Sequence, residues 1–399
     1  MPEFYDELET RSMDERHASQ LAQLQNRLSE ANATIESKEA ATTVVDLAGL
    51  AKLPVLRKAD LAARQNATPP FGGIKTSNIT HYFQSPGPIY EPGRLRGDWW
   101  RLGRFLHASG VTASDIVQNC FSYHLTPAGM MFESAAAAIG AKVLPAGTGQ
   151  TELQVQAAAH LGITVYAGTP DYLKIILDKA DTLGLDLSKI TRAAVGGGAL
   201  FPSLRQEYQD RGIACVQCYA TADLGNIAYE SEAMEGMIID EGVIVEIVTP
   251  GTGNPVAMGE VGEVVVTTLN PDYPLIRFAT GDLSAMMPGV SPCGRTNLRI
   301  KGWMGRADQT AKIKGMFVRP EQVATFVARH PEVAKARIIA TRQGESDHMT
   351  VQVESDGANT EELEGSVREI LKLRGKVVLN SLGTLPNDGI VIDDQRSYD

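Results

Sequence analysis

Short apolar runs alternate with amphipathic stretches through the middle of the chain. Between residues 115 and 219, strand-like runs are separated by stretches whose apolar residues recur at helical spacing. The expected strands are 115–123, 142–145, 162–167, 191–195 and 213–219, and the expected helices are 129–139, 152–161, 170–183 and 201–211. Strands that alternate with helices form parallel βαβ units, whose ligands gather outside the carboxyl ends of the strands. We therefore expect an α/β fold here.

Both ends of the chain have a different pattern. Leu21, Leu24 and Leu28 recur at helical spacing within residues 1–45, and a second helix is expected from Asp98 to Gly110. Beyond residue 225, β-rich runs occupy 242–248, 262–268 and 275–278. A smaller α+β pattern follows, with the run 312–318, expected strands at 336–340 and 349–353, and expected helices at 320–329 and 361–373.

These patterns predict two domains. The expected N-terminal domain, residues 1–304, combines parallel βαβ sheets with a β-rich subdomain, and the expected C-terminal domain, residues 305–399, is small and mobile. No low-complexity linker separates the two, so a short hinge around residues 306–308 is expected. A length of 399 residues agrees with this division, because it exceeds what one ordinary compact domain holds.

Composition and charge exclude several classes of protein. Hydrophobic residues make up 43% and charged residues 21% of the chain, which is typical of globular proteins. No apolar run approaches the roughly 18 residues that span a bilayer, and the acidic N-terminus has neither a basic head nor an apolar stretch behind it. We expect a cytoplasmic protein with no membrane partner. The net charge of −11, with its basic residues scattered, argues against nucleic acid as a partner.

Two of the four cysteines have a spacing that deserves an explanation. Cys215 and Cys218 are spaced like half a zinc site or a redox pair. The residues around them alternate as in a strand, and no second half of a zinc site accompanies them. Buried, unreactive thiols are therefore the preferred interpretation.

Two candidate binding segments follow consecutive expected strands. Gly196, Gly197 and Gly198 come directly after strand 191–195, where glycines let a ring or a phosphate approach the backbone closely. Tyr219 and Asp223 follow the next strand, where they can stack on a base and hold hydrated Mg²⁺. The alternatives are a packed strand-to-helix turn for the glycines and a helix cap for the second segment.

Two further segments carry charged side chains. Asp282 belongs to a Thr-Gly-Asp sequence after run 275–278, where a turn would let its carboxylate accept hydrogen bonds from both hydroxyls of a ribose. Arg306 lies in Gly-Arg-Ala-Asp-Gln at the boundary between the expected domains. An Asx-turn is the alternative for Asp282, and an ordinary surface turn is the alternative for Arg306.

These segments, in this order, resemble the adenylate-forming superfamily, and within it the phenylacetate–CoA ligase family. LPVLRKADL at 53–61, LIRFATGDL at 275–283 and GRADQ at 305–309 carry much of the resemblance, which spans nearly the whole chain. It implies that an aryl or phenylacetate-like carboxylic acid reacts with ATP and Mg²⁺ to give acyl-AMP, and that the acyl group then passes to coenzyme A. It also implies a swing of the C-terminal domain about Asp308, and suggests a homodimer.

The resemblance assigns roles to individual residues. The expected ATP/AMP-binding positions are Ser85, Gly196, Gly197, Gly198, Tyr219, Ala220, Thr221, Asp282 and Arg306. Within this set, the glycines would line the adenine site, Tyr219 would stack on the base and Asp282 would hold the ribose. Asp223 would bind Mg²⁺, and Asp223, Arg306 and Asn387 are the expected catalytic positions.

The acid is expected to lie near residues 123–129. Its proposed contacts are Tyr123, His124, Ala128 and Gly129, whose bulky and small side chains can shape a flat aryl pocket. For His124, the alternative is a packed polar residue without a substrate contact.

Three positions depart from the family. The phosphate loop, which carries a lysine in the family, is replaced by Ser85-Pro-Gly-Pro-Ile-Tyr-Glu-Pro92, whose prolines lack N–H donors and whose Glu91 would repel phosphate. Asp223 replaces a glutamate, and Asn387 stands where the family has a lysine; losing such a cation costs about 10²–10³ in rate. The nearby arginines are either phosphate ligands or part of a solvated helix face. They are Arg94, Arg96, Arg101 and Arg104.

Three functions are compatible with these observations. The first is an ATP-dependent acid–CoA ligase that holds its triphosphate with unusual groups. The second is a degenerate nucleotide- or CoA-binding partner or regulatory subunit. The third is an adenylating enzyme whose acceptor is an amine or a carrier thiol.

Overall fold

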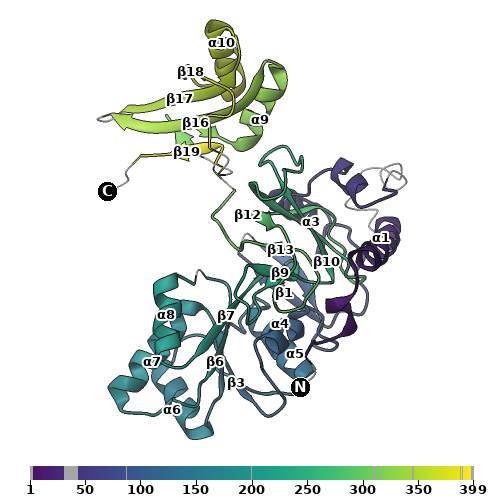
Figure 1. Cartoon of the computed structure of the whole chain (residues 1–399), viewed down its shortest axis with the longest axis vertical. Coiled ribbons are helices and arrows are strands. Elements are labelled where there is room, and N and C mark those ends of the chain that lie inside the picture. The colour runs from purple at the N-terminus through teal and green to yellow at the C-terminus, as the bar shows by residue number, and fades with distance from the viewer. Residues whose placement is uncertain are drawn as a thin grey trace. The chain divides into compact units, whose positions relative to one another are not determined.

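The computed structural model divides the chain into two compact units. Residues 3–30, 44–86, 88–198, 200–307, 309, 311–314, 316–343, 346–386, 388 and 390–396 are described (Figure 1). The first unit comprises Met1–Val245, Val266–Phe278 and Met287–Trp303, and the second comprises Glu246–Val265, Ala279–Met286 and Met304–Asp399. The expected hinge residue Asp308 and the expected catalytic residue Asn387 lie outside the described residues.

Parallel strands form the centre of the first unit, as the sequence predicts. They pair in the order β7-β6-β5-β3-β4. Their bounds are β3 (Ile116–Asn119), β4 (Lys142–Pro145), β5 (Val165–Gly168), β6 (Arg192–Val195) and β7 (Ala214–Thr221). The helices between them are α5 (Ala128–Ile139), α6 (Thr151–Leu161), α7 (Pro170–Leu183) and α8 (Pro202–Asp210). Each element begins and ends within a few residues of its expected position, so the predicted α/β class is confirmed.

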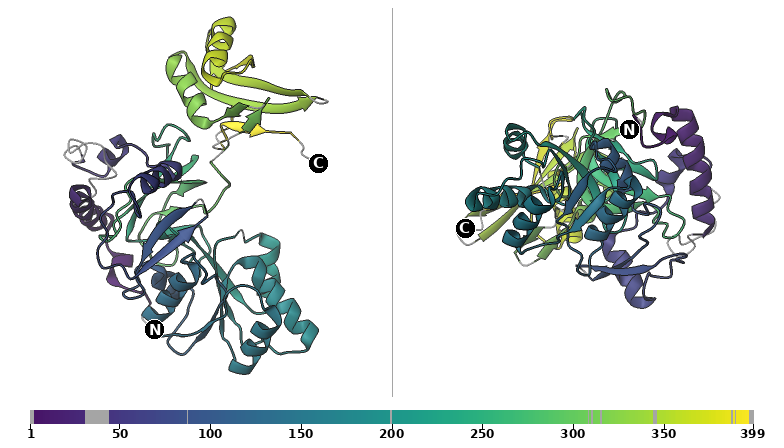
Figure 2. Two further views of the ribbon diagram at one scale, coloured as in Figure 1. Left: turned by 180° about the vertical axis from the view of Figure 1, so that it is seen from behind. Right: turned by 90° about the horizontal axis from the view of Figure 1, so that it is seen from below.

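Helices cover both faces of these parallel strands. Helices α6, α7 and α8 lie together on one side, and α4 (Leu102–Ala108) and α5 lie on the other (Figures 1 and 2). Leu173 and Ile176 of α7 are fully buried in one core cluster with Ala193 and Val195 of β6. The apolar side chains on one face of each helix therefore form one layer of the core, and those of the strands form the other.

Antiparallel strands extend this sheet beyond β7. β8 (Gly225–Tyr229), β9 (Met237–Ile239) and β13 (Arg299–Ile300) follow in that spatial order, each antiparallel to the one before. Further strands are β10 (Val243–Val248), β11 (Val261–Thr268) and β12 (Phe278–Met287). The expected run 275–278 is displaced, because the strand starts at Phe278. Asp282 consequently lies within β12 and not on a turn after a strand, so that expectation is corrected.

The N-terminal segment is helical, as expected. It contains η1 (Glu7–Thr10), α1 (Met13–Glu30), η2 (Ala48–Lys52) and α3 (Lys58–Ala67). Leu24 and Leu28 of α1 are buried in a cluster with Leu50 and Leu269. The predicted stripe on α1 is thus the face by which the segment packs on the first unit. In the described part of the chain, no helix combines the length and the hydropathy that crossing a bilayer requires.

The segment in place of a phosphate loop is a β-hairpin. β1 (His81–Ser85) and β2 (Ile89–Gly93) pair antiparallel, with Ser85 opposite Ile89. Pro86 and Pro88 lie in the connection, outside the ladder, where their missing N–H groups cost no hydrogen bond. The stretch is therefore ordered by its own pairing.

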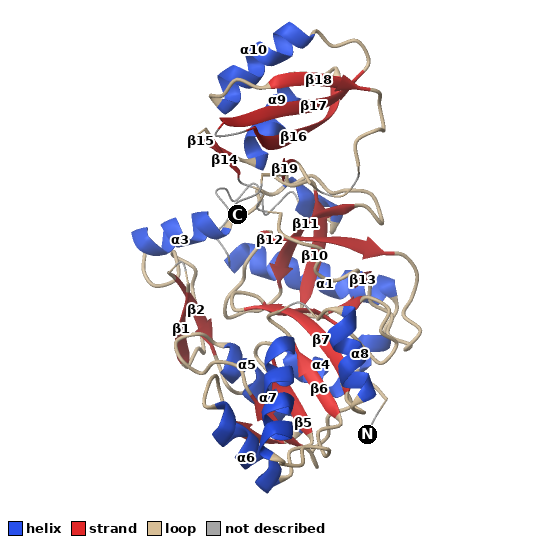
Figure 3. Ribbon diagram, turned by 90° about the vertical axis from the view of Figure 1, so that its left-hand side faces the viewer, coloured by secondary structure: helices blue, strands red, loops and turns tan. Residues whose placement is uncertain are grey.

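The C-terminal part of the second unit is an α+β module. Its four-stranded sheet has the order β18-β17-β16-β19; the central pair is antiparallel and both outer pairs are parallel. Helices α9 and α10 lie beside the sheet and share its core (Figure 3). The elements are β14 (Ala311–Ile313), β15 (Met316–Val318), α9 (Pro320–Arg329), β16 (Val333–Gln343), β17 (Ser346–Ser355), α10 (Thr360–Leu371), β18 (Lys376–Asn380) and β19 (Ile392–Asp394).

Candidate active site

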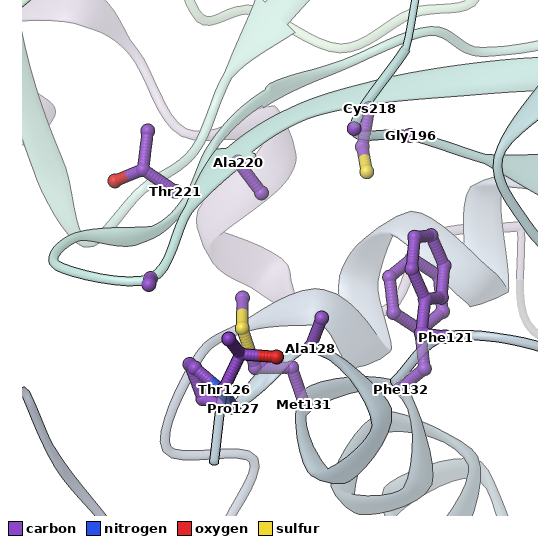
Figure 4. Close-up of a pocket in the computed structure, with 12 residues that line it drawn as sticks. Phe121, Thr126, Pro127, Ala128, Met131, Phe132, Gly196, Cys218, Ala220 and Thr221 are labelled. Carbon is purple, nitrogen blue, oxygen red and sulfur yellow. The ribbon is translucent and has the colours of Figure 1, made fainter. Parts of the chain in front are cut away.

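A small, mostly apolar pocket lies at the carboxyl ends of the parallel strands. Its volume is about 110 Å³. Its walls come from the residues after β3, from the start of α5, from the glycine turn after β6 and from the end of β7 (Figure 4). The lining residues are Phe121, Thr126, Pro127, Ala128, Met131, Phe132, Gly196, Gly197, Cys218, Ala220, Thr221 and Ala222.

The pocket brings together two groups of residues that the sequence assigns separately. Ala128 comes from the expected acid-binding segment, whereas Gly196, Gly197, Ala220 and Thr221 come from the expected nucleotide-binding segments. Segments about 70 residues or more apart in sequence therefore share one cavity. The doubly wound topology accounts for this, because it places the carboxyl ends of parallel strands at one edge.

The aromatic wall of this pocket was not predicted from the sequence. Phe121 and Phe132 stack with their ring centroids 4.3 Å apart and their planes at 24°. Ala128, Met131 and Phe132 are spaced as neighbours on one face of a helix, which is a signal that the sequence does contain. Phe121 follows a different strand and contacts α5 only through the tertiary fold, so its role is not visible from local pattern.

Three expected acid contacts, Tyr123, His124 and Gly129, lie outside the lining. The hydroxyl of Tyr123 accepts a hydrogen bond from Asn119 Nδ2 at 2.8 Å, and its ring packs on Gly129, where a Cβ atom would come within 2.8 Å of the ring. His124 is exposed. Tyr123 and Gly129 thus form a packed support behind the pocket wall.

Packing and backbone conformation explain why glycines occupy the turn after β6. A Cβ atom on Gly196 would lie 2.9 Å from Cys218 Sγ, and Gly197 has a φ of +69°. Gly198 and Tyr219 do not line the pocket, although Gly198 adjoins it in sequence. Packing therefore explains these glycines, and the same absence of side chains opens the pocket wall at this point.

Asp223 lies in a group of buried carboxyls. It is only 5% exposed; its Oδ2 is 3.2 Å from Lys58 Nζ, and no described residue is a hydrogen-bond partner of its Oδ1. Glu91 is fully buried, and no described residue donates a hydrogen bond of ordinary geometry to either of its carboxylate oxygens. Burial, and next the charge of Asp223, raise the pKa of Glu91 to about 7, while nearby Ser85 and Lys58 oppose the rise.

Three of the four candidate phosphate arginines form ion pairs inside the protein. Arg101 Nε and Arg104 Nη1 contact the two oxygens of Asp240 at 2.8 and 3.1 Å, and Arg94 lies 3.5 Å from Asp272. Arg101 and Arg104 are mostly buried and are paired with Asp240, so they do not form a solvated helix face; to bind phosphate, either would have to leave Asp240. Arg96 is exposed.

Arg101 also supports the turn that carries Asp223. Its Nη2 donates to the backbone carbonyls of Leu224 at 2.6 Å and Asn226 at 3.0 Å. The guanidinium therefore fixes the chain immediately after Asp223, and its contribution to the site is to position that carboxylate.

In the second unit, the two residues expected to hold the ribose and support the nucleotide contact each other. Arg306 Nη1 lies 2.9 Å from Asp282 Oδ1, and the backbones of the same two residues form an antiparallel bridge. Gly281, with a φ of +74°, leaves room for this arginine, because a Cβ atom there would lie 2.7 Å from Arg306 Nη2. The side chain of Arg306 remains 56% exposed, which leaves it accessible to a ligand.

The cysteine interpretation is confirmed. Cys215 and Cys218 are buried free thiols on β7, and burial raises the pKa of each to about 12. The described residues contain no group of three or more His, Cys, Asp or Glu side chains arranged to hold a metal ion.

Comparisons with known proteins confirm the resemblance. Residues 101–270 match the family model of AMP-binding enzymes. The chain is 29% identical over 347 residues to a phenylacetate-coenzyme A ligase from Aromatoleum evansii, covering 81% of this chain and 77% of the relative. It is also 29% identical over 374 residues to the phenylacetate-coenzyme A ligase of Escherichia coli K12, covering 88% and 84%.

Solved structures agree on the fold. A 2-hydroxyisobutyryl-CoA ligase in its postadenylation state, in complex with 2-HIB-AMP, superposes with a TM-score of 0.71 at 24% identity, covering 97% of this chain and 91% of that chain. An open conformation of 2-hydroxyisobutyryl-CoA ligase in complex with 2-HIB-AMP and CoA gives a TM-score of 0.70. The α/β architecture expected from the sequence is therefore that of these ligases.

Proposed function

We propose that this chain is an adenylate-forming acid–CoA ligase, as its match to AMP-binding enzymes and its similarity to phenylacetate-coenzyme A ligases indicate. It would activate a carboxylic acid with ATP to form acyl-AMP and pyrophosphate. The acyl group would then pass to the thiol of coenzyme A. Binding both reactants in one site removes most of the entropic cost of bringing them together.

The pocket at the ends of β3, β6 and β7 carries this proposal. One of its walls is the acid segment with Ala128, and another is formed by Gly196, Gly197 and the backbone after Cys218. Acyl-AMP formation requires the carboxylate to reach the α-phosphate of a nucleotide bound beside it. A cavity shared by the two segments meets that requirement.

The size of the pocket bears on which acid it takes. A cavity of about 150 Å³ lined by apolar side chains holds benzene, and this pocket measures about 110 Å³. The stacked Phe121 and Phe132 favour a flat ring, and the volume favours a small one. An aryl or phenylacetate-like acid remains our first candidate, and short branched acids belong in the same test.

The remaining site residues keep their proposed roles. Tyr219 and the glycines at 196–198 would contact the base, and Asp282 would bind the ribose with support from Arg306. Asp308 would be the hinge between residues 1–304 and 305–399, and Asn387 would approach the nucleotide where relatives place a lysine.

The carboxyls near Lys58 fit a magnesium ion. Mg²⁺ in nucleotide sites is usually held by one or two carboxylates together with substrate phosphates and water. Asp223 Oδ1 and both carboxylate oxygens of Glu91 are buried, and no described residue forms a hydrogen bond of ordinary geometry with them. When bound, the ion would neutralise charge on the phosphates.

A pyrophosphate-exchange assay tests the proposal. Protein, ATP, Mg²⁺ and labelled pyrophosphate would be incubated with phenylacetate, benzoate and short branched acids in turn, and acyl-CoA would be measured separately after adding coenzyme A. Acid-dependent exchange together with thioester is the expected result. Exchange without thioester would indicate another acceptor, such as an amine or a carrier thiol.

A second candidate function follows from the absence of a lysine in the hairpin between Phe83 and Gly93. A degenerate relative would bind AMP or CoA without turnover and act as a partner or regulatory subunit. Calorimetric binding of AMP by folded protein, with no exchange for any acid, would support it against the ligase. Light scattering on the same sample would test the expected dimer.

A further inference from the structure

An ATP-dependent ligase needs a cation for the β- and γ-phosphates, and the hairpin does not supply one. β1 and β2 contain no lysine or arginine. Arg101 and Arg104 are paired with Asp240, and Arg94 is close to Asp272. Beside the exposed Arg96, a cation on a different element is therefore a candidate for this role.

Lys58 is a cation that pairs with one of the buried carboxyls. It is the first residue of α3, and its Nζ lies 3.2 Å from Asp223 Oδ2. The lysine side chain is 46% exposed, whereas the aspartate side chain is only 2% exposed. The ammonium group thus lies between solvent and the buried carboxylate, in a position that an incoming anion can reach.

The same helix is attached to the hairpin. Gln65 lies seven residues after Lys58, two turns along the same face of α3. Its side-chain Nε2 donates to the carbonyl of Tyr90, and its Oε1 accepts from the amide of Tyr90, both at 2.8 Å. Tyr90 is followed directly by the buried Glu91. Helix α3 therefore holds Lys58 in a fixed relation to the segment that occupies the position of the phosphate loop.

We propose that Lys58 binds the terminal phosphates of ATP and replaces the lysine that the hairpin lacks. This inference rests on the proposed function. Without nucleotide, the ammonium neutralises Asp223; with nucleotide bound, it turns to the phosphate oxygens and leaves Asp223 available to Mg²⁺. A lysine on a flexible stem is suited to this exchange, because it acts as a point charge with three rotatable donors.

The competing explanation is an ordinary ion pair. A half-exposed Lys–Asp pair adds little to stability and has no preference among nucleotides. The two explanations differ in what they predict for AMP, which has no terminal phosphates. A phosphate ligand discriminates ATP from AMP, and a structural ion pair does not.

Calorimetric titrations with AMP and with Mg-ATP, without acid or coenzyme A, test the proposal. Lys58→Met keeps the length of the side chain, Lys58→Arg keeps the charge, and Lys75→Ala removes an exposed lysine elsewhere on the same segment. We expect Lys58→Met to weaken ATP binding by about 10- to 100-fold, the loss of one charge-assisted hydrogen bond, and AMP binding by less than about threefold. Lys58→Arg should recover part of the loss, and Lys75→Ala should change neither affinity.

The possible failures are separable. An unchanged ratio of ATP to AMP affinity in Lys58→Met would overturn the role of Lys58 and leave the proposed function standing. If the wild-type chain bound neither nucleotide, the proposed function and this inference would both fail. If thermal unfolding shows that Lys58→Met is destabilised, the ATP and AMP affinities are compared in Lys58→Gln and Lys58→Arg instead.

Discussion

At the scale of single residues, the buried carboxylate of Asp98 lowers the stability of the folded protein at neutral pH. It lies in the left-handed region with a φ of +47°, and its Oδ2 accepts a hydrogen bond from the amide of Gly103 at 2.9 Å, so it supports the start of α4. Burial is the main reason that the pKa of Asp98 rises from 3.8 to about 6. The folded protein therefore carries an ionised, poorly solvated group at neutral pH.

Replacing Asp98 by Asn should stabilise the protein at neutral pH. Between pH 3.8 and about 6 the folded state binds a proton that the unfolded state does not, so wild-type stability falls as pH rises through 6. Asn removes this cost, keeps an acceptor for Gly103 and tolerates a positive φ. We expect a gain of up to about 3 kcal/mol at pH 7–8 that shrinks toward zero near pH 4, measured by urea unfolding. A gain of equal size at every pH would contradict the explanation.

Gly196 and Gly365 differ in how much space a Cβ atom would find. At Gly196 a Cβ atom would lie 2.9 Å from Cys218 Sγ, whereas at Gly365, inside α10, nothing lies within 4 Å. Gly196→Ala should cost about 1–3 kcal/mol by overpacking and should weaken AMP binding, because the pocket wall must shift. Gly365→Ala, the matched control, should gain about 0.5–1 kcal/mol from helix propensity. Thermal unfolding and AMP titration of both variants check the pair, and a stable, tight-binding Gly196→Ala would contradict the packing.

At the scale of elements, a buried ion-pair network attaches η1 to the sheet. Glu9 is 1% exposed; its Oε1 accepts from Tyr229 Oη at 2.6 Å and from Arg295 Nε at 2.8 Å, and its Oε2 accepts from the amide of Tyr5 at 2.7 Å. A single carboxylate thereby joins the N-terminal segment to the end of β8 at Tyr229 and to the loop that carries Arg295, both more than 200 residues away. Its removal would leave Arg295 buried without this carboxylate.

Glu9→Gln should destabilise the protein strongly. Breaking a buried pair by removing one charge typically costs about 3–5 kcal/mol. Glu7→Gln in the same short helix is the control, because Glu7 is exposed and its loss should change stability by less than about 0.5 kcal/mol. Denaturant unfolding of both variants gives the comparison. Equal effects from the two would show that η1 is attached by other contacts.

Elements were predictable from the sequence wherever local pattern decides them. The stripe on α1 and the alternation from β3 to β7 follow directly from hydrophobic period. The run 275–278 misled because its apolar residues are buried without being extended. Arg277, with a φ of +49°, interrupts the strand, and its guanidinium donates to backbone carbonyls of Ala51 and Leu53. A contact over more than 220 residues decides that backbone, and no local pattern records it.

Site residues were likewise predictable where a motif marks them, and not where a distant partner decides their role. Gly196, Gly197 and Ala128 were predicted from motif and order, and the structure places these three in one pocket. The roles of Arg101 and Arg104 were not predictable, because their partner Asp240 lies more than 130 residues away. Lys58 was overlooked for the same reason, since its contact with Asp223 joins the N-terminal segment to the end of β7.

At the scale of the whole molecule, the proposed reaction has two steps that need different arrangements of the chain. The resemblance places the change at Asp308. Asp308→Pro fixes φ at that position, whereas Asp308→Ala leaves it free to rotate. We expect Asp308→Pro to slow thioester formation by at least about tenfold while acyl-AMP still forms, and Asp308→Ala to lose little of either step. Single-turnover quenching, with acyl-AMP and acyl-CoA quantified separately, checks this; equal slowing of both steps would contradict a hinge there.

The hairpin between Phe83 and Gly93 has a thermodynamic consequence. A flexible loop loses conformational entropy each time it closes on a nucleotide, and this loss weakens binding. Here the segment is already paired through β1 and β2, and Gln65 holds Tyr90 in place. Little disorder remains to be lost, so if a nucleotide binds beside the hairpin, as the resemblance implies, we expect its binding to have a correspondingly small entropic penalty.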